Sequence, residues 1–298
     1  MEQVPDELFE AGRVARRLKE EAYRLARPGA SIYELAERIE SIILDNHARP
    51  AFPCNVGINQ VAAHYTPTPG DVTRIPPKSV VKVDIGVEIN GFIADTAITV
   101  ADTPEGEAMR LAAEEALKTA LKLVRDGVRV ADIGSAIQSV VNRRGFKTIR
   151  NLTGHEISRY NLHAGQSIPN VQTTDSGRLR KGHTYAIEPF VTLPEGAGEV
   201  VESGELTIFR LEPRPKLEKG LREDEVSLLR YIANEFQSLP YSTRWLIRLG
   251  REKLEIHEKL VRNGRIHAYP VLVERHGTPV AQAEHTVLVK EDGAEILT

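Results

Sequence analysis

Residues 80–100 read VVKVDIGVEINGFIADTAITV, and this stretch decides the fold. The Asn90-Gly91 pair lies between two apolar flanks rich in β-branched residues. This is the strongest short signal for a β-hairpin, because a two-residue turn of this kind needs positive φ at both central positions. Asp84 and Asp95 then project from one sheet face as diagonal neighbours, roughly 7–8 Å apart at the backbone. The predicted cross-strand pairs are Ile89 with Phe92, Gly86 with Asp95, and Asp84 with Ala97.

Two carboxylates directed into one space repel each other unless a cation lies between them or one of them is protonated. A pair of divalent ions about 3.5–4 Å apart would fit the gap between Asp84 and Asp95. The alternative is that one aspartate faces water and serves only the hairpin. The hairpin alone leaves both interpretations open.

Three further segments place a His or Glu among small, apolar or turn-forming residues: NLTGH at 151–155, YAIEP at 185–189 and AQAEHTV at 281–287. A buried, unpaired carboxylate in such a stretch costs several kcal/mol and needs a counter-charge. Four carboxylates and one imidazole form an oxygen-rich set that balances two divalent cations and suits Mn or Fe(II), with Co or Zn as alternatives. The candidate metal ligands are Asp84, Asp95, His155, Glu188 and Glu284.

In this order, the segments VKVDIG, IADTA, NLTGH, AIEPF and AEHTV resemble the methionine aminopeptidases of the pita-bread fold. The resemblance extends to residues 51–59, 62–67 and 162–165, and so covers nearly the whole chain. It is to the type II enzymes, because a long insertion at about 212–266 separates the last two ligands. We therefore expect an α+β fold, with one catalytic domain over residues 1–298, pseudo-twofold halves and a helical insertion subdomain.

The resemblance implies a dinuclear metal-dependent aminopeptidase that releases N-terminal methionine from nascent peptides. A hydroxide held by the metals would attack the first peptide bond. By resemblance, Asp95 and Glu284 would bridge both ions, Asp84 would complete one site, and His155 with Glu188 would complete the other. Glu188 would also be the general base that takes the proton of the attacking water.

The resemblance also implies two substrate-facing histidines, His163 donating to the carbonyl oxygen and His64 to the scissile amide. Phe52, Leu162 and Ala283 would line an apolar pocket for the methionine side chain. The other histidines are interpreted as structural, and His285 should point away from Glu284 because successive strand residues face opposite sides. These structural histidines are His47, His183, His257, His267, His276 and His285.

Two alternatives share the fold. An X-Pro-specific peptidase has the same ligand set, but we expect it to carry an N-terminal domain for which a first ligand at position 84 leaves no room. A non-enzymatic pita-bread protein that binds RNA or ribosomes should have lost metal ligands and should carry a basic tail. All five ligands are present here, and we see no such tail.

Composition agrees with a soluble enzyme: 298 residues, 41% hydrophobic, 27% charged and a net charge of −3. That charge predicts no membrane or specific nucleic-acid partner. The single cysteine excludes an internal disulfide and fits a reducing compartment. The chain has no apolar run near about 18 residues and no signal-peptide pattern, so we expect a cytoplasmic monomer. The insertion has 12 Lys or Arg against 9 Asp or Glu, which leaves open a weak ribosome contact.

Hydrophobic periodicity and capping signals place helices at 6–26, 31–47, 104 to about 126, and 131–144. Strands should dominate from about 183 to 211. Within the insertion we expect helices at 222–236 and 242–263, each with an apolar stripe that packs the core. The last segment, 268–291, should form paired strands around Gly277-Thr-Pro279. The stripe residues are Val226, Leu229, Ala233 and Phe236 on the first helix, and Trp245, Leu249, Ile256 and Leu260 on the second.

Overall fold

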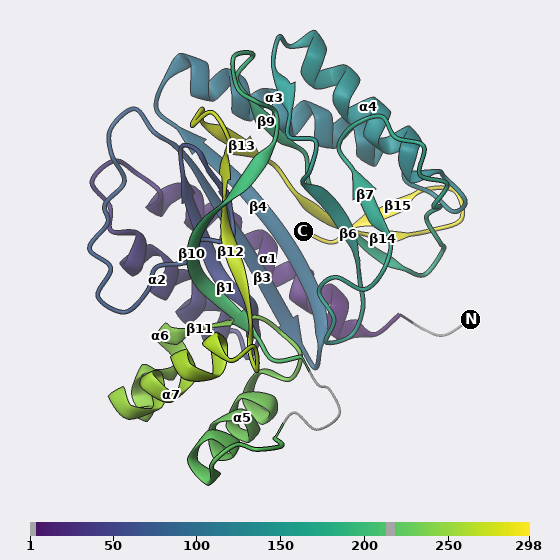
Figure 1. The fold of residues 1–298 in the computed structure, drawn as a ribbon. Coiled ribbons are helices and arrows are strands. Elements are labelled where there is room, and N and C mark those ends of the chain that lie inside the picture. The colour runs from purple at the N-terminus through teal and green to yellow at the C-terminus, as the bar shows by residue number, and fades with distance from the viewer. Residues whose placement is uncertain (1–3, 213–217) are drawn as a thin grey trace.

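The computed structural model describes residues 4–212 and 218–298. Within these residues, helices alternate with antiparallel sheets and no regular βαβ repeat is present, which confirms the α+β class. Figure 1 shows strands in the centre of the molecule, with helices around them and the helices of the insertion grouped at the lower end of the view.

The predicted hairpin is the centre of the first half. Strands β3 (Val80–Ile89) and β4 (Phe92–Ala101) pair with Gly86 opposite Asp95 and Asp84 opposite Ala97, as predicted. Asn90 and Gly91 adopt φ values of 52° and 86°, which is the left-handed geometry that the two-residue turn requires. Strand β1 (Arg49–Ile58) joins on the other side and gives the order β1-β3-β4.

Two helices cover this sheet, α1 (Asp6–Leu25) and α2 (Ile32–Asp45). The Ser31 side chain accepts a hydrogen bond from the Glu34 backbone N–H and starts α2 where the capping pattern predicts. Both helices bury a stripe of Leu, Ile, Val and Ala against the apolar side of the hairpin. The hairpin is therefore held rigidly from behind, and its aspartates face the interior of the molecule.

The second half repeats the arrangement with α3 (Pro104–Leu121) and α4 (Val130–Arg143). Helix α3 ends five residues before the predicted position, in a turn that includes residues 122 and 123. The two helices pack on one three-stranded sheet, β13-β9-β5, and one five-stranded sheet, β15-β14-β8-β6-β7. These strands are β5 (Lys147–Thr148), β6 (Thr153–Ile157), β7 (Ser167–Pro169), β8 (Thr184–Ile187), β9 (Phe190–Thr192), β13 (Val280–Gln282), β14 (His285–Val289) and β15 (Ala294–Ile296).

A fourth sheet, β11-β10-β12-β2, connects the halves to the insertion. Its strands are β2 (Val61–Ala63), β10 (Val200–Arg210), β11 (Tyr241–Ser242) and β12 (His267–Glu274). The predicted pairing of residues 268–291 with one another is wrong. Strand β12 pairs with β10 and β2, β13 pairs with β9, and β14 pairs with β8 and β15.

The turn after β12 explains why these strands separate. The buried Glu274 carboxylate accepts hydrogen bonds from the backbone N–H groups of Ala197, His276 and Thr278. This closes the chain into a compact turn that leads β13 toward a different sheet. The strands β12, β13 and β14 therefore pair with other strands and not with one another.

The insertion contains α5 (Glu223–Phe236), α6 (Thr243–Leu246), the 3-10 turn η1 (Ile247–Leu249) and α7 (Arg251–Arg262). The single helix predicted over 242–263 is wrong, because Gly250 adopts φ 92° and breaks it. Leu229, Phe236, Ile256 and Leu260 are buried in a separate apolar cluster, as the stripes predict, and three further stripe residues pack against it while partly buried: Ala233, Trp245 and Leu249. Val226 is only partly buried and is not part of this cluster, so the prediction is wrong for this residue. The predicted boundary near residue 212 adjoins residues 213–217, which lie outside the described residues.

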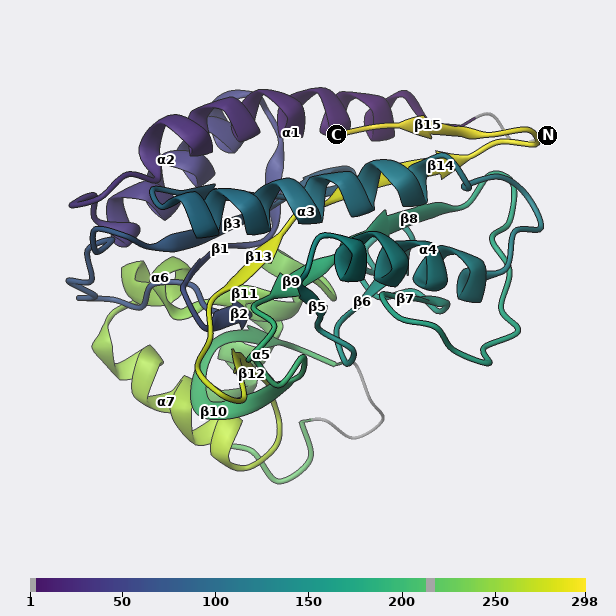
Figure 2. The same cartoon turned by 90° about the horizontal axis from the view of Figure 1, so that it is seen from above.

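Figure 2 shows α1, α2 and α3 along one side of the molecule and β10 with α7 along the other. The strands that carry the predicted site residues lie between these layers. Within residues 4–212 and 218–298, no helix is both long and apolar enough to cross a membrane.

Candidate metal centre

All five predicted metal ligands line one cavity between the two halves. Asp84 and Asp95 come from the β3–β4 hairpin, His155 from β6, Glu188 from the link between β8 and β9, and Glu284 from the link between β13 and β14. None of them points away from the other four. Segments separated by up to 200 residues therefore meet at one point.

The closest approaches form a compact ligand set. His155 Nε2 lies 3.4 Å from Glu188 Oε1 and 3.7 Å from Asp95 Oδ2. One ligand atom from each of Asp95, His155 and Glu284 lies within 4.8 Å of the other two. Asp84 and Glu188 face the same cavity and are partly open to it.

Threonine hydroxyls align the Glu284 segment beside β4. Thr286 accepts a hydrogen bond from the Asp95 N–H and donates one to the Asp95 carbonyl, both at 2.7 Å. Thr96 donates to the Glu284 carbonyl at 2.9 Å, and the Glu284 N–H donates to the Ala97 carbonyl at 3.2 Å. These buried bonds fix the separation of the Asp95 and Glu284 carboxylates.

Glycine brings His155 close to the centre. A Cβ on Gly154 would lie 2.2 Å from the carbonyl oxygen of Ala186, so only glycine lets β6 approach β8 this closely. Directly after β7, Asn170 donates from its amide to the carbonyls of Leu152 and Glu188, each at 2.9 Å. This amide ties the His155 and Glu188 segments together.

Burial and mutual repulsion change the acidity of the cluster. Burial raises the pKa of Asp84 to about 7 and holds the pKa of Asp95 well above its usual range, with the charge of Asp84 acting in the same direction. Burial, followed by neighbouring carboxylates, also raises the pKa of Glu188 and of Glu284. Burial lowers the pKa of His155 to about 3, so the imidazole is neutral at pH 7 and free to donate a lone pair.

The residues fit divalent cations. One oxygen on each of Asp84, Asp95 and Glu284 is buried and has no hydrogen-bond partner among the described residues. Such oxygens are costly unless a cation completes their environment. Carboxylates with one neutral imidazole are a ligand set that hard or borderline divalent metals accept.

Two amides beside the ligands were not identified from sequence. Gln282 donates from Nε2 to Glu188 Oε2 at 3.3 Å and lies 3.5 Å from Glu284 Oε2. Asn55 donates from Nδ2 to Asp84 Oδ2 at 3.3 Å. Gln282 lies two residues before Glu284, and in an extended chain that spacing predicts the same face, so period-two counting from the ligand would have found it.

The two predicted substrate-facing histidines border the same cavity. The His163 ring lies 4.4 Å from the His155 ring, centroid to centroid. His64 adopts φ 64°, and its Nδ1 lies 3.3 Å from the Pro270 carbonyl. A non-glycine residue held in the left-handed region stores strain, and such strain is concentrated at functional sites.

The predicted pocket residues separate into two groups. Phe52 and Leu162 line the cavity, whereas Ala283 is buried in the core beneath α3 and α4 and does not line the cavity. Tyr269 and Pro240 line the cavity although sequence reasoning did not select them. Both lie near or within the insertion, whose position relative to the metal ligands no local pattern indicates.

Several of the histidines interpreted as structural contact side chains that are not metal ligands. His285 Nδ1 lies 3.3 Å from Lys19 Nζ and 3.1 Å from Thr298 Oγ1, and His285 does not line the cavity that Glu284 lines. His257 Nε2 lies 3.0 Å from the Tyr241 hydroxyl. His183 Nδ1 lies 2.5 Å from Glu156 Oε1.

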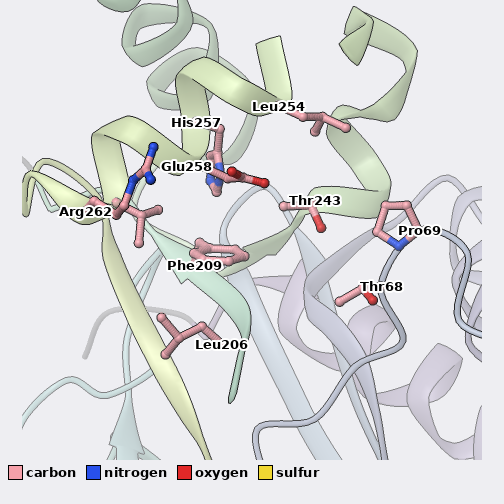
Figure 3. A pocket seen from close by; sticks show the side chains of 10 residues that line it. Thr68, Pro69, Leu206, Phe209, Thr243, Leu254, His257, Glu258 and Arg262 are labelled. Carbon is pink, nitrogen blue, oxygen red and sulfur yellow. The ribbon is translucent and has the colours of Figure 1, made fainter. Parts of the chain in front are cut away.

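A second cavity, of about 500 Å³, lies where α7 meets β10. Figure 3 shows Phe209 and Leu206 on one side and His257, Glu258 and Arg262 of α7 on the other. It includes none of the predicted metal ligands or substrate residues. The centre described above therefore remains the candidate site.

Comparison with known proteins agrees with this geometry. The model of metallopeptidase family M24 matches residues 6–291, so the chain belongs to this family. The chain is 43% identical to a methionine aminopeptidase of Pyrococcus horikoshii, covering 98% of this chain and 99% of that protein. It is 41% identical to a methionine aminopeptidase of Saccharolobus solfataricus, covering 98% and 97%.

Solved structures show the same fold. A thermophilic Arx1 superposes with a TM-score of 0.82 at 17% identity, covering 98% of this chain and 89% of that chain. A methionine aminopeptidase of Thermotoga maritima superposes with a TM-score of 0.69 at 24% identity, covering 99% and 98%. At these identities the likeness concerns the fold, and the predicted pita-bread fold is confirmed.

Proposed function

We propose that this protein is a dinuclear metal-dependent methionine aminopeptidase, which hydrolyses the first peptide bond of peptides that begin with methionine. The observation that carries the proposal is the convergence of four carboxylates and a neutral imidazole beside an apolar cavity. Full-length similarity to methionine aminopeptidases above 40% identity supports it. The use of divalent metal follows from the family, and we propose two ions.

Asp95 and Glu284 are the proposed bridging ligands, Asp84 the ligand of one ion, and His155 with Glu188 the ligands of the other. When bound, the metals would supply Lewis-acid polarisation of the scissile carbonyl and acidify an attacking water. Mn or Fe(II) suits this ligand set, with Co or Zn as alternatives.

The chain's own residues then supply proton transfer and orientation. Glu188 Oε1 lies 3.4 Å from His155 Nε2 at the cavity, and burial raises the pKa of this carboxyl, which makes the carboxylate a stronger proton acceptor. Gln282 holds the other carboxylate oxygen at 3.3 Å and so orients Glu188. We propose that Glu188 takes the proton of the attacking water and delivers it to the departing amine.

His163 and His64 would donate hydrogen bonds to the substrate. Donors aimed at a developing oxyanion contribute about 10²–10³ in turnover each. Phe52 and Leu162 are buried and line the cavity beside the ligands. We propose that they contact the unbranched thioether side chain of the substrate methionine.

The test is release of free methionine from Met-Ala-Ser after metal removal and re-addition of single ions, against Leu-Ala-Ser and X-Pro controls. Ion-dependent release of methionine supports the proposal. Cleavage of the X-Pro bond in preference would move the assignment to the X-Pro-specific peptidase, and no hydrolysis with any ion would favour a non-enzymatic RNA- or ribosome-binding protein. A monomeric state, a cytoplasmic location and a weak contact with the ribosome are further proposals.

A further inference from the structure

Three segments far apart in sequence meet at Tyr160, beside the substrate cavity. The Tyr160 N–H donates to the Gly91 carbonyl at 2.8 Å, in the turn of the metal-bearing hairpin. The Tyr160 carbonyl accepts a hydrogen bond from the hydroxyl of Ser238 in the insertion. We call this meeting point the Tyr160 junction; it comprises Asn90-Gly91, residues 158–161 and residues 237–239.

The ring of Tyr160 is fitted against the hairpin turn. A Cβ on Gly91 would lie 2.4 Å from the Tyr160 ring, so the turn must be glycine for the ring to lie there. Arg159 donates from Nε to the Asn90 carbonyl at 2.8 Å, and its guanidinium lies 5.6 Å from the centroid of the Tyr160 ring. Two consecutive residues, Arg159 and Tyr160, therefore contact the hairpin turn.

The junction holds its backbone under strain. Tyr160 and Gln237 both adopt φ 55°, a left-handed conformation that bulky side chains rarely take. Such residues persist only where surrounding contacts over-determine them, and they cluster at ligand-binding positions. Here the strain falls on both chain segments that lead into the cavity.

Residues that line the cavity follow each of these two strained residues in the chain. Leu162 and His163 come two and three residues after Tyr160, and both line the cavity. Pro240 comes three residues after Gln237 and lines it from the insertion side. Between them, Leu239 packs in one apolar cluster with Phe52 and Leu162, and Tyr160 packs against that cluster.

We propose that Tyr160 is a positioning residue for the peptidase reaction: its ring and backbone fix Leu162 and His163 in register with the wall that the insertion supplies through Ser238, Leu239 and Pro240. This inference rests on the proposed function. It assigns the insertion a part in substrate selection, through one hydrogen bond and one apolar contact at the junction.

The variant Tyr160→Asn removes the ring but keeps a residue that tolerates the left-handed conformation, so the protein should fold. Tyr160→Phe is the matched control, because it keeps the ring. Ser238→Ala removes only the bond from the insertion. Each is assayed on Met-Ala-Ser with added Mn²⁺, and Mn²⁺ affinity is measured by calorimetry.

We expect Tyr160→Asn to lower kcat/KM by about 10- to 100-fold, with kcat reduced through His163 and KM raised through Leu162, because misplacement by about 1 Å can cost 10²-fold. Tyr160→Phe should behave as the parent protein. Ser238→Ala should raise KM by about fivefold at constant kcat, the usual contribution of one hydrogen bond. Mn²⁺ affinity should be the same in all three.

Parent values of kcat and KM in Tyr160→Asn would overturn the proposal, as would a loss of Mn²⁺ affinity that parallels the loss of activity. Equal losses in Tyr160→Phe and Tyr160→Asn would also overturn it. If the parent protein releases no methionine, the proposed function fails separately. The NMR chemical shifts of the His163 ring then test the proposal on Tyr160. A change in these shifts in Tyr160→Asn but not in Tyr160→Phe supports the proposal, and unchanged shifts in Tyr160→Asn contradict it.

Discussion

The Phe52 ring lies directly against the backbone of Gly86, so that a Cβ on Gly86 would be 2.3 Å from Cε1 of the ring. Gly86 is paired with Asp95 across the hairpin, and Phe52 lines the cavity. The absence of a side chain at position 86 thus sets how far the ring can withdraw from the cavity. The width of the pocket and the geometry of the metal hairpin depend on the same strand.

Gly86→Ala should push the Phe52 ring into the cavity. Overpacking of this kind costs about 1–3 kcal/mol, and we expect KM for Met-Ala-Ser to rise at least about tenfold with little change in Mn²⁺ affinity. Steady-state kinetics and calorimetry measure the two quantities. Gly293→Ala is the matched control, since its Cβ would meet nothing within 4 Å. An unchanged KM would show that the Phe52 ring can move away without entering the cavity, and it would contradict the prediction.

Glu188→Gln should lower kcat by about 10²–10⁴, since an amide cannot accept the proton that general-base catalysis transfers. The shape of the cavity is retained, so substrate binding should change less than turnover. Rapid-quench measurement of methionine release separates the two. Glu195→Gln, an exposed residue on the following turn, is the control. A kcat within a few-fold of the parent value would assign the base to another group.

Glu284→Gln should make the metal-free protein more stable, because burial and the neighbouring carboxylates disfavour ionisation of Glu284 and an amide carries no ionisable group. The same variant should lose the stabilisation by Mn²⁺, which for the parent protein is about 2.7 kcal/mol at a hundredfold excess over Kd. Thermal melts with and without Mn²⁺ test both signs. Asp292→Asn, at an exposed position, should change neither. A less stable metal-free Glu284→Gln would contradict the repulsion argument.

Cation binding should strengthen as pH rises through about 7. Burial raises the pKa of Asp84 to about 7, so below that pH a cation must displace a proton from this carboxyl. His155 contributes no such dependence, because burial lowers its pKa to about 3 and it is already neutral. Calorimetry in buffers of different ionisation enthalpy should show proton release near pH 6. An affinity independent of pH between about 6 and 8 would refute the assignment.

Arg244→Met should destabilise the protein by about 3–5 kcal/mol, because it leaves the buried Glu40 carboxylate without its counter-charge. The Arg244 side chain is 1% exposed and donates to Glu40 Oε1 at 2.7 Å and to Oε2 at 2.9 Å, joining the insertion to α2. Urea unfolding measures the change. Arg251→Ala, whose side chain is 94% exposed, should stay within about 0.5 kcal/mol of the parent protein. A second change, Glu40→Gln, should restore part of the loss.

Local chemistry made the hairpin predictable. The Asn90-Gly91 turn and the period-two pattern of its flanks specify register without help from the rest of the chain, so the common direction of Asp84 and Asp95 could be read directly. The start of the second helix was also within reach, because the Ser31 cap is a local interaction. The other three ligands were selected by their apolar surroundings and by resemblance.

The sequence by itself determined which acidic residues stand in apolar, strand-like segments, where a buried carboxylate needs either a cation or hydrogen-bond donors. Only the tertiary structure decided which strands pair after residue 274, where Gly250 divides the insertion, and that Pro240 and Tyr269 line the cavity. The physical reason is that a turn or cap is stabilised by neighbours in the chain. Strand partners and cavity walls are instead chosen by the packing of apolar surfaces from distant segments, and no local pattern records that choice.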